Sequence, residues 1–263
     1  MTFNTYYINL KQDKQRNQET ISELNKTNLI YQRFEAINGK EVDKQELIRQ
    51  NIITKYSKYY LIDKTIGCGA SHKLLYKYIQ KYDKNNFCLV LEDDILVTNP
   101  ELNYSQEIND IVNKYNKKNI HWDIIRLHSC FYGTGSTAAY IVNINNIEKI
   151  KKKPLYNHID IQQFNDLKVY SEHKLFNTRD HLIHYKNPFY NIYFDNQTIG
   201  FYFNQPACKL WGYSIFMSYF FYSIIFLLLF FKKYKIFILF ILFIIVVIFY
   251  NNIFINYKYG KVS

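Results

Sequence analysis

Short apolar runs alternate with longer polar segments through most of the chain. The first run, 6–10, is followed by a polar segment, 13–28, in which Ile21 and Leu24 share one side, and then by a second apolar run, 29–34. A strand, a helix and a strand in this spacing predict a βαβ unit. The chain is therefore expected to form an α/β fold around a mostly parallel sheet.

One apolar run ends in three consecutive carboxylates. Residues 89–91 are followed by Glu92, Asp93 and Asp94, and the apolar pattern resumes over 95–97. Such a run predicts a buried strand with the acids at its carboxyl end, where open α/β sheets bind ligands. Adjacent carboxylates repel one another unless a cation joins them, so we expect Asp94 and one of its neighbours to hold Mn²⁺ or Mg²⁺. A strand end with solvated acids is the alternative.

Two glycines precede a predicted helix. Gly67 and Gly69 let the backbone approach a ligand closely, and the helix is expected over about 70–82. Its amino end is expected to hold a phosphate, with Ser71 and His72 as hydrogen-bond donors to the phosphate or the sugar. A buried, hydrogen-bonded structural histidine is the alternative for His72.

The remaining pattern predicts several shorter elements and two further acidic candidates. Helices are expected over 43–50, 100–115 and 145–153, strands over 122–127 and 137–142, a turn at 38–39, and a tyrosine-rich loop over the site at 51–65. Asp160 follows a proline-bounded loop and is the first candidate for a general base, with Asp123 second. A helix N-cap is the alternative for Asp160.

Two long apolar segments, 214–231 and 236–255, lie near the end of the chain, on either side of a lysine-rich turn. Each is close to the roughly 20 residues that a helix needs to cross a bilayer. We therefore expect a domain over 1–212 and a membrane-anchoring tail over 213–263. No apolar signal segment precedes the domain, so it is expected in the cytosol. Two arrangements stay open: both segments cross the bilayer, or only 236–255 crosses it. The positive-inside tendency favours a crossing by 236–255 alone.

Charge and cysteine usage narrow the possible partners. The net charge is +11, but the five lysines of the tail contribute to it, and the residues before 213 hold 28 basic and 22 acidic side chains without an arginine-rich stripe. This charge distribution argues against nucleic acid as a binding partner. Binding to anionic lipid or to a diphosphate substrate would explain it equally well. The cysteines show no paired spacing, which predicts reduced thiols and no zinc site. They are Cys68, Cys88, Cys130 and Cys208.

An ordered series of motifs over about residues 5–170 resembles glycosyltransferase family 25, the family of lipopolysaccharide-biosynthesis transferases and procollagen galactosyltransferases. The series is Ile8-Asn9-Leu10 with Arg16, Phe34-Glu35-Ala36-Ile37-Asn38-Gly39, Ile66-Gly67-Cys68 with Ser71-His72, Leu91-Glu92-Asp93-Asp94, Trp122-Asp123 and Ala139-Tyr140-Ile141. Gly69 stands where the family commonly has a larger residue, and the membrane tail lies outside the resemblance.

The resemblance implies a GT-A-like fold, a nucleotide-sugar donor that is most often UDP-galactose, a divalent metal, and inversion at the anomeric carbon. The acceptor would be a hydroxyl of a glycan, a glycolipid or a protein. The acid run corresponds to the family's DxD-like metal and diphosphate site. The residues expected to bind the donor are Asn9, Arg16, Asn38, Gly39, Gly67, Ser71 and His72.

Two other functional classes compete with a transferase. A metal-dependent phosphoesterase could use the same acids, but the seven histidines form no cluster along the sequence that would hold two metals. A degenerate transferase, kept as a membrane-anchored structural or interaction protein, is the other alternative. The intact acid run argues against it.

Overall fold

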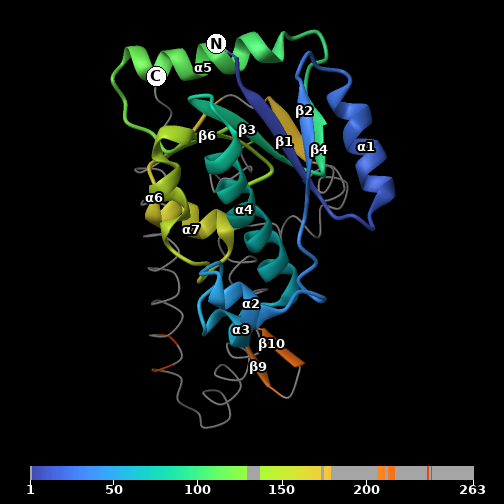
Figure 1. Cartoon of the computed structure of the whole chain (residues 1–263), viewed down its shortest axis with the longest axis vertical. Coiled ribbons are helices and arrows are strands. Elements are labelled where there is room, and N and C mark those ends of the chain that lie inside the picture. Colours follow the sequence, from blue (N-terminus) through green and yellow to red (C-terminus); the bar gives the residue numbers. More distant parts are fainter. Residues whose placement is uncertain are drawn as a thin grey trace. The chain divides into compact units, whose positions relative to one another are not determined.

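The computed structural model describes residues 2–128, 137–172, 175–178, 206–210 and 213–216, together with Ile236 and Ile238 (Figure 1). The chain divides into two compact units. The first contains every described residue up to 178, and the second contains the described residues from 206 onward.

A six-stranded mixed sheet organises the first unit, in the order β2-β1-β3-β6-β5-β7. Strands β1, β2 and β3 are parallel, as are β5 and β7, whereas β6 runs antiparallel to both of its neighbours. The predicted α/β fold with a mostly parallel sheet is confirmed. The strands are β1 (Asn4–Asn9), β2 (Tyr31–Glu35), β3 (Phe87–Glu92), β5 (Ile124–Arg126), β6 (Ala139–Asn143) and β7 (Val169–Ser171). A separate antiparallel pair is formed by β4 (Ile95–Val97) and β8 (Phe176–Thr178).

Helices flank the sheet, with α1 beside β2 and β4 and with α4, α6 and α7 grouped together (Figure 1). The Asp13, Asp43 and Asn103 side chains accept hydrogen bonds from backbone N–H groups of the first turns of α1, α2 and α5, which fixes where these helices begin. The helices are α1 (Lys14–Leu24), α2 (Lys44–Arg49), α3 (Ser57–Tyr60), α4 (Asp63–Tyr82), α5 (Tyr104–Lys117), the 3₁₀ turn η1 (Ile144–Asn146), α6 (Ile147–Lys152) and α7 (Ile159–Asp166).

The central strand β3 is buried from Phe87 to Leu91. Its Phe87, Leu89 and Leu91 side chains belong to a core cluster that also contains the inward residues of α5, such as Ile108 and Tyr115. A second cluster joins α2 and α4 to the segment between α6 and α7 and includes Leu47, Ile66 and Leu155. The apolar run before the acids is thus the buried strand that its pattern predicts.

Helix α4 begins seven residues earlier than predicted, at Asp63. Gly67 and Gly69 therefore lie inside the helix, and the prediction that the helix starts beside them is wrong. Phosphate binding at this place stays a prediction. A Cβ added to Gly67 would lie 2.7 Å from the Ile37 carbonyl oxygen and 2.8 Å from the Gly39 nitrogen. Gly67 therefore lets the helix pack directly against the loop after β2. The tyrosine-rich loop predicted over 51–65 is in fact partly helical, because it holds α3 and the start of α4.

The described part of the second unit is an antiparallel hairpin of β9 (Pro206–Leu210) and β10 (Tyr213–Phe216). Residues 214–216 are thus extended where the sequence predicted the start of a membrane helix. The rest of the two predicted spans, apart from Ile236 and Ile238, lies outside the described residues. Within the part of the chain that the structure describes, no helix has the length and apolarity needed to cross a bilayer.

The two helical glycines provide a matched test of the packing. Gly67→Ala is expected to lower the free energy of unfolding by about 1–3 kcal/mol, because the new methyl group meets rigid backbone, and this outweighs the roughly 1 kcal/mol gained in helix propensity. Gly69→Ala meets only the flexible end of the Leu155 side chain and is expected to change the free energy of unfolding by less than about 1 kcal/mol. Urea denaturation of both variants measures the difference. Equal stabilities would contradict this account of the close approach.

Candidate functional site

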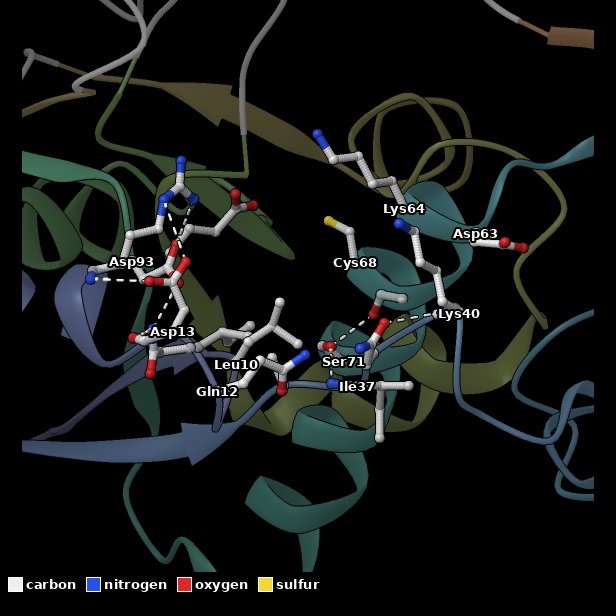
Figure 2. Close-up of a pocket in the computed structure, with 18 of the residues that line it drawn as sticks. Leu10, Gln12, Asp13, Ile37, Lys40, Asp63, Lys64, Cys68, Ser71 and Asp93 are labelled. Atoms are coloured by element: carbon white, nitrogen blue, oxygen red, sulfur yellow. Dashed lines mark hydrogen bonds and ion pairs between the residues drawn. The ribbon is translucent and has the colours of Figure 1, made fainter. Parts of the chain in front are cut away.

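The carboxyl ends of β1, β2 and β3 meet at one edge of the sheet. Asn9, the last residue of β1, pairs with Glu35 at the end of β2, and Ile8 pairs with Glu92 at the end of β3. A pocket of about 480 Å³ opens at this edge (Figure 2). Its walls come from the end of β1 and the first turns of α1, the loop after β2, the first half of α4, and the end of β3.

Most of the residues predicted to bind substrate or metal line this one pocket. They are Asn9, Arg16, Asn38, Gly39, Gly67, Ser71, His72, Glu92 and Asp93. Asp94, Asp123 and Asp160 are not among the lining residues. Residues 9 to 93 thus converge from four segments that are separated along the chain.

Asp93 lies on the wall formed by β3 and α1. Its Oδ1 accepts a hydrogen bond from Arg16 Nη1 at 3.0 Å, and its Oδ2 accepts one from Asn9 Nδ2 at 2.7 Å. Burial raises the pKa of Asp93 above its usual range, and the contacts with Asn9 and Arg16 oppose that rise. One carboxylate oxygen of Asp93 therefore ties α1 to the end of β3, and the other ties the end of β1 to it.

Glu92 faces the opposite direction, toward α4. His72 Nε2 lies 3.1 Å from Glu92 Oε1, and His72 Nδ1 lies 2.7 Å from the Tyr140 hydroxyl. Burial acts to raise the pKa of Glu92, but the hydrogen bond from His72, with help from Thr137, outweighs it and holds that pKa below its usual value. The Glu92 carboxylate is thus kept ionised at the pocket.

The hydrogen bonds behind His72 continue into the protein interior. Gln163 Nε2 donates to the Tyr76 hydroxyl at 2.5 Å, and the Tyr76 and Tyr140 hydroxyls lie 2.7 Å apart. With the Tyr76 hydroxyl donating to Tyr140 and the Tyr140 hydroxyl donating to His72, Nδ1 of His72 accepts a hydrogen bond and Nε2 donates one to Glu92. A ring with one acceptor and one donor nitrogen is the neutral form of histidine. The ring is buried and hydrogen-bonded, as the structural alternative for His72 predicted, and it also lines the pocket. Hydrogen bonding of His72 to a phosphate or a sugar stays a prediction.

Ser71 serves the local structure rather than pointing a donor at a ligand. Its hydroxyl donates to the Gly67 carbonyl at 2.7 Å and accepts from the Ile37 N–H at 2.8 Å. This side chain therefore links α4 to the loop after β2, at the same place where Gly67 and Gly39 allow the two backbones to meet.

Two exposed lysines were missed in the sequence analysis. Lys40 and Lys64 lie with Cys68 on the pocket wall opposite Asp93 and Asp13 (Figure 2). Lys64 stands in the first turn of α4, in a stretch predicted as loop. Lys40 directly follows the predicted turn at 38–39, and that position was the available signal. The wall with Lys40 and Lys64 also carries Asp63, and Arg16 lies beside Asp93 on the opposite wall.

The three consecutive carboxylates do not converge into a ligand cluster. Glu92 turns to His72 and Asp93 turns to Arg16, so the two side chains diverge. Among the described residues, the group of three possible ligand atoms that lie within 4.8 Å of one another is instead formed by Cys68, His72 and Glu92.

Asp160 lies near the pocket but outside its lining. It stands in the first turn of α7, whose N-cap residue is His158, so the N-cap alternative for Asp160 is wrong. The His158 ring lies 3.2 Å from the Thr65 hydroxyl of α4, and the buried Arg126 donates to the Asp160 carbonyl at 2.9 Å. The first contact holds the start of α7 against the first turn of α4, and the second holds it against β5.

The charge of Asp160 reaches the pocket at Cys68. Enclosure of this thiol and then the negative charges of Glu92, Asp160, Asp94 and Asp93 raise the pKa of Cys68 well above its usual value. Asp160 and Asp94 therefore lie close enough to act electrostatically on the same space as the two lining acids.

Asp123, the second candidate base, lies at the other edge of the sheet. It precedes β5, whose first residue pairs with Val142, and Val142 in turn pairs with Cys88 near the start of β3. The Asp123 carboxylate forms an ion pair with Lys149 and accepts the Lys168 N–H at 2.8 Å. The structure does not bring Asp123 to the pocket.

The sequence matches one family model over most of the sheet-containing unit. The model described as glycosyltransferase family 25 (LPS biosynthesis protein) matches residues 2–183. Among curated proteins, no sequence matches this chain.

Solved structures show only a distant likeness. A197 from STIV is 9% identical, with 66% of this chain and 83% of that chain covered and a TM-score of 0.39. The galactosyltransferase LgtC, in complex with donor and acceptor sugar analogs, is 9% identical, with coverages of 64% and 73% and a TM-score of 0.37. The glycosyltransferase GlyE of Streptococcus pneumoniae TIGR4 is 12% identical, with coverages of 82% and 58% and a TM-score of 0.40.

The Arg16–Asp93 contact predicts a change in titration. Arg16→Met removes the positive charge that lies beside Asp93, so the pKa of Asp93 is expected to rise further. Carbon-detected NMR of the carboxyl group measures this pKa. A carboxyl group whose pKa is higher in the folded than in the unfolded protein keeps its proton to a higher pH in the folded state. Stability therefore falls as the pH rises between the unfolded and folded pKa values, and this fall is expected to be larger in the variant. Arg49→Met, which changes an exposed arginine on α2, is the control, and an unchanged Asp93 pKa in Arg16→Met would contradict the prediction.

Proposed function

Because the chain belongs to glycosyltransferase family 25 and is therefore a glycosyltransferase, we propose that its pocket binds a nucleotide-sugar donor and transfers the sugar, with inversion, to a hydroxyl acceptor. The observation that carries the proposal is the convergence of the predicted donor-binding residues on one pocket at the carboxyl edge of parallel strands. The volume of about 480 Å³ suits a ligand of this size.

The wall with Lys40 and Lys64 is proposed to bind the donor diphosphate. Both side chains are exposed and reach into the pocket opposite the acids (Figure 2). Two ammonium groups at this position stabilise the negative charge that builds on the diphosphate as the glycosidic bond breaks. Arg16 reaches the same space from α1 while it also holds Asp93.

Glu92 and Asp94 are proposed to hold Mn²⁺ or Mg²⁺. Both supply the hard carboxylate oxygens that these ions prefer, and Glu92 is kept ionised by His72, whereas Asp93 is already engaged by Arg16 and Asn9. A bound ion of this kind supplies further positive charge to the leaving diphosphate. UDP-galactose is the proposed donor, on the strength of the family resemblance.

Asp160 is proposed as the general base. Its position in the first turn of α7 places its charge near Cys68, at the end of the pocket away from Asp93 and Arg16. A carboxylate there would accept the proton of the acceptor hydroxyl as that oxygen attacks the anomeric carbon from the face opposite the diphosphate.

The donor and the metal are tested with the full chain and a panel of UDP-sugars. Slow UDP release is expected from UDP-galactose with Mn²⁺ and not with EDTA, and Glu92→Gln and Asp94→Asn are each expected to reduce it at least about 100-fold. Asp110→Asn, an exposed acid on α5, is the control. Release from a different sugar would overturn the proposed donor, and release that persists in EDTA would overturn the metal. NMR early in the reaction reports inversion as the initial release of the β anomer of the sugar from the α-linked donor.

The base is tested on transfer to water, which needs no knowledge of the acceptor. Asp160→Asn is expected to reduce the rate of UDP-sugar hydrolysis by roughly 10²–10⁴-fold while UDP still binds with wild-type affinity. Asp166→Asn removes a carboxylate from the same helix that pairs with Lys153, and it is expected to retain hydrolysis. Wild-type hydrolysis by Asp160→Asn would exclude Asp160 as the base.

A further inference from the structure

Cys68, His72 and Glu92 form a cluster in which the proposed transfer uses only Glu92 as a metal ligand. Cys68 and His72 are four residues apart on α4 and therefore share one face of the helix, and Glu92 meets them from the end of β3. One ligand atom from each, Sγ, Nε2 and a carboxylate oxygen, lies within 4.8 Å of the other two. His72 Nε2 and Glu92 Oε1, at 3.1 Å, are already about as close as two ligands on one small ion.

The chemistry of these three atoms selects a particular class of metal. A thiolate, an imidazole nitrogen and one carboxylate oxygen are a borderline-soft set that suits Zn²⁺, whereas Mn²⁺ and Mg²⁺ prefer oxygen alone. We propose that Cys68, His72 and Glu92 bind one Zn²⁺ ion in the pocket, with a fourth position open to solvent or substrate. The sequence analysis predicted no zinc site because the helical pairing of Cys68 with His72 across to Glu92 has none of the paired-cysteine spacings of zinc motifs.

The surroundings of His72 are those of a metal ligand. Its ring is 1% exposed, and the Tyr140 hydroxyl at Nδ1 holds it so that Nε2 points at Glu92 and the pocket. A ring nitrogen fixed from behind in this way is the usual arrangement of zinc-bound histidine. Cys68, in contrast, is exposed to the pocket, so an ion can reach the site from solvent.

Binding has a simple proton balance. The Cys68 thiol loses its proton to solvent when Sγ bonds the metal. The His72 ring stays neutral, because Nε2 gives up its hydrogen to bond the metal while Nδ1 takes one up and donates it to the Tyr140 oxygen. One proton is therefore released for each ion bound.

The site makes Glu92 a shared ligand. In the proposed transferase the same carboxylate helps to hold Mn²⁺, so Zn²⁺ at Cys68 and His72 would compete with the catalytic ion. The zinc proposal rests on the geometry of the pocket and not on the transferase activity, and it is therefore tested by binding.

The experiment uses the full chain, stripped with a chelator and titrated with Zn²⁺ against a chromophoric chelator, and in parallel with Co²⁺ as an absorbing substitute. The expected result is one ion per chain and a thiolate-to-cobalt charge-transfer band. Cys68→Ser is expected to lose the band and at least about 100-fold in Zn²⁺ affinity, and Tyr140→Phe to lose about 10–100-fold because the ring loses its support. Cys208→Ser, in β9, is the matched control and is expected to keep both the cobalt charge-transfer band and the Zn²⁺ affinity of the unaltered chain.

Three outcomes would overturn the proposal: no stoichiometric Zn²⁺ binding, equal affinity in Cys68→Ser and the unaltered chain, or a cobalt spectrum without the thiolate band. Circular dichroism melts of each variant show whether a loss reflects unfolding. Glu92→Gln keeps the size of the side chain and is expected to weaken Zn²⁺ binding as well, so the site is tested through two ligands. Active enzyme without zinc binding would leave the proposed transfer intact, and zinc binding without transfer would leave the zinc site intact.

Discussion

A buried row of hydrogen-bonded side chains connects the pocket to the interior. It runs from Glu92 through His72, Tyr140 and Tyr76 to Gln163 and joins the end of β3 to α4, β6 and α7. Each of these groups would carry a free-energy penalty if it were buried without a partner, so the elements that supply them are fixed relative to one another. The orientation of His72, and with it the ionised state of Glu92, depends on this row.

The main features of the fold could be predicted from local patterns. The βαβ start, the buried strand before Glu92 and the helix capped by Asp13 each follow from a few neighbouring residues. The start of α4 could not be predicted in this way. Ile62, at its N-cap position, offers no side-chain oxygen, and Gly67 and Gly69 ordinarily weaken a helix. They are retained inside it because the loop after β2 packs against Gly67 and the Leu155 side chain packs against Gly69, and such contacts cannot be identified without the fold.

The candidate site was predictable as a set of residues but not as a set of contacts. The strand ends showed where Asn9 and Glu92 would meet. Nothing in the sequence indicated that Asp93 would turn to Arg16 while Glu92 turned to His72. Asp123 was a candidate because it borders a strand and belongs to the Trp122-Asp123 motif, and the direction of β5 relative to β3 decides that it lies at the far edge. The direction of a short strand depends on its partners in the sheet.

The pocket and its support come from different parts of the chain. Every residue that lines the pocket lies between Ile8 and Asp93, whereas Tyr140 and Gln163, which orient His72 from behind, follow much later. During synthesis, the ribosome therefore releases all of the lining residues before it releases the two side chains that set the histidine. In a nascent chain that has emerged only as far as β3, the His72 ring still lacks Tyr140, and the Tyr76 hydroxyl still lacks Gln163. The site becomes chemically complete only after α7 has emerged and docked.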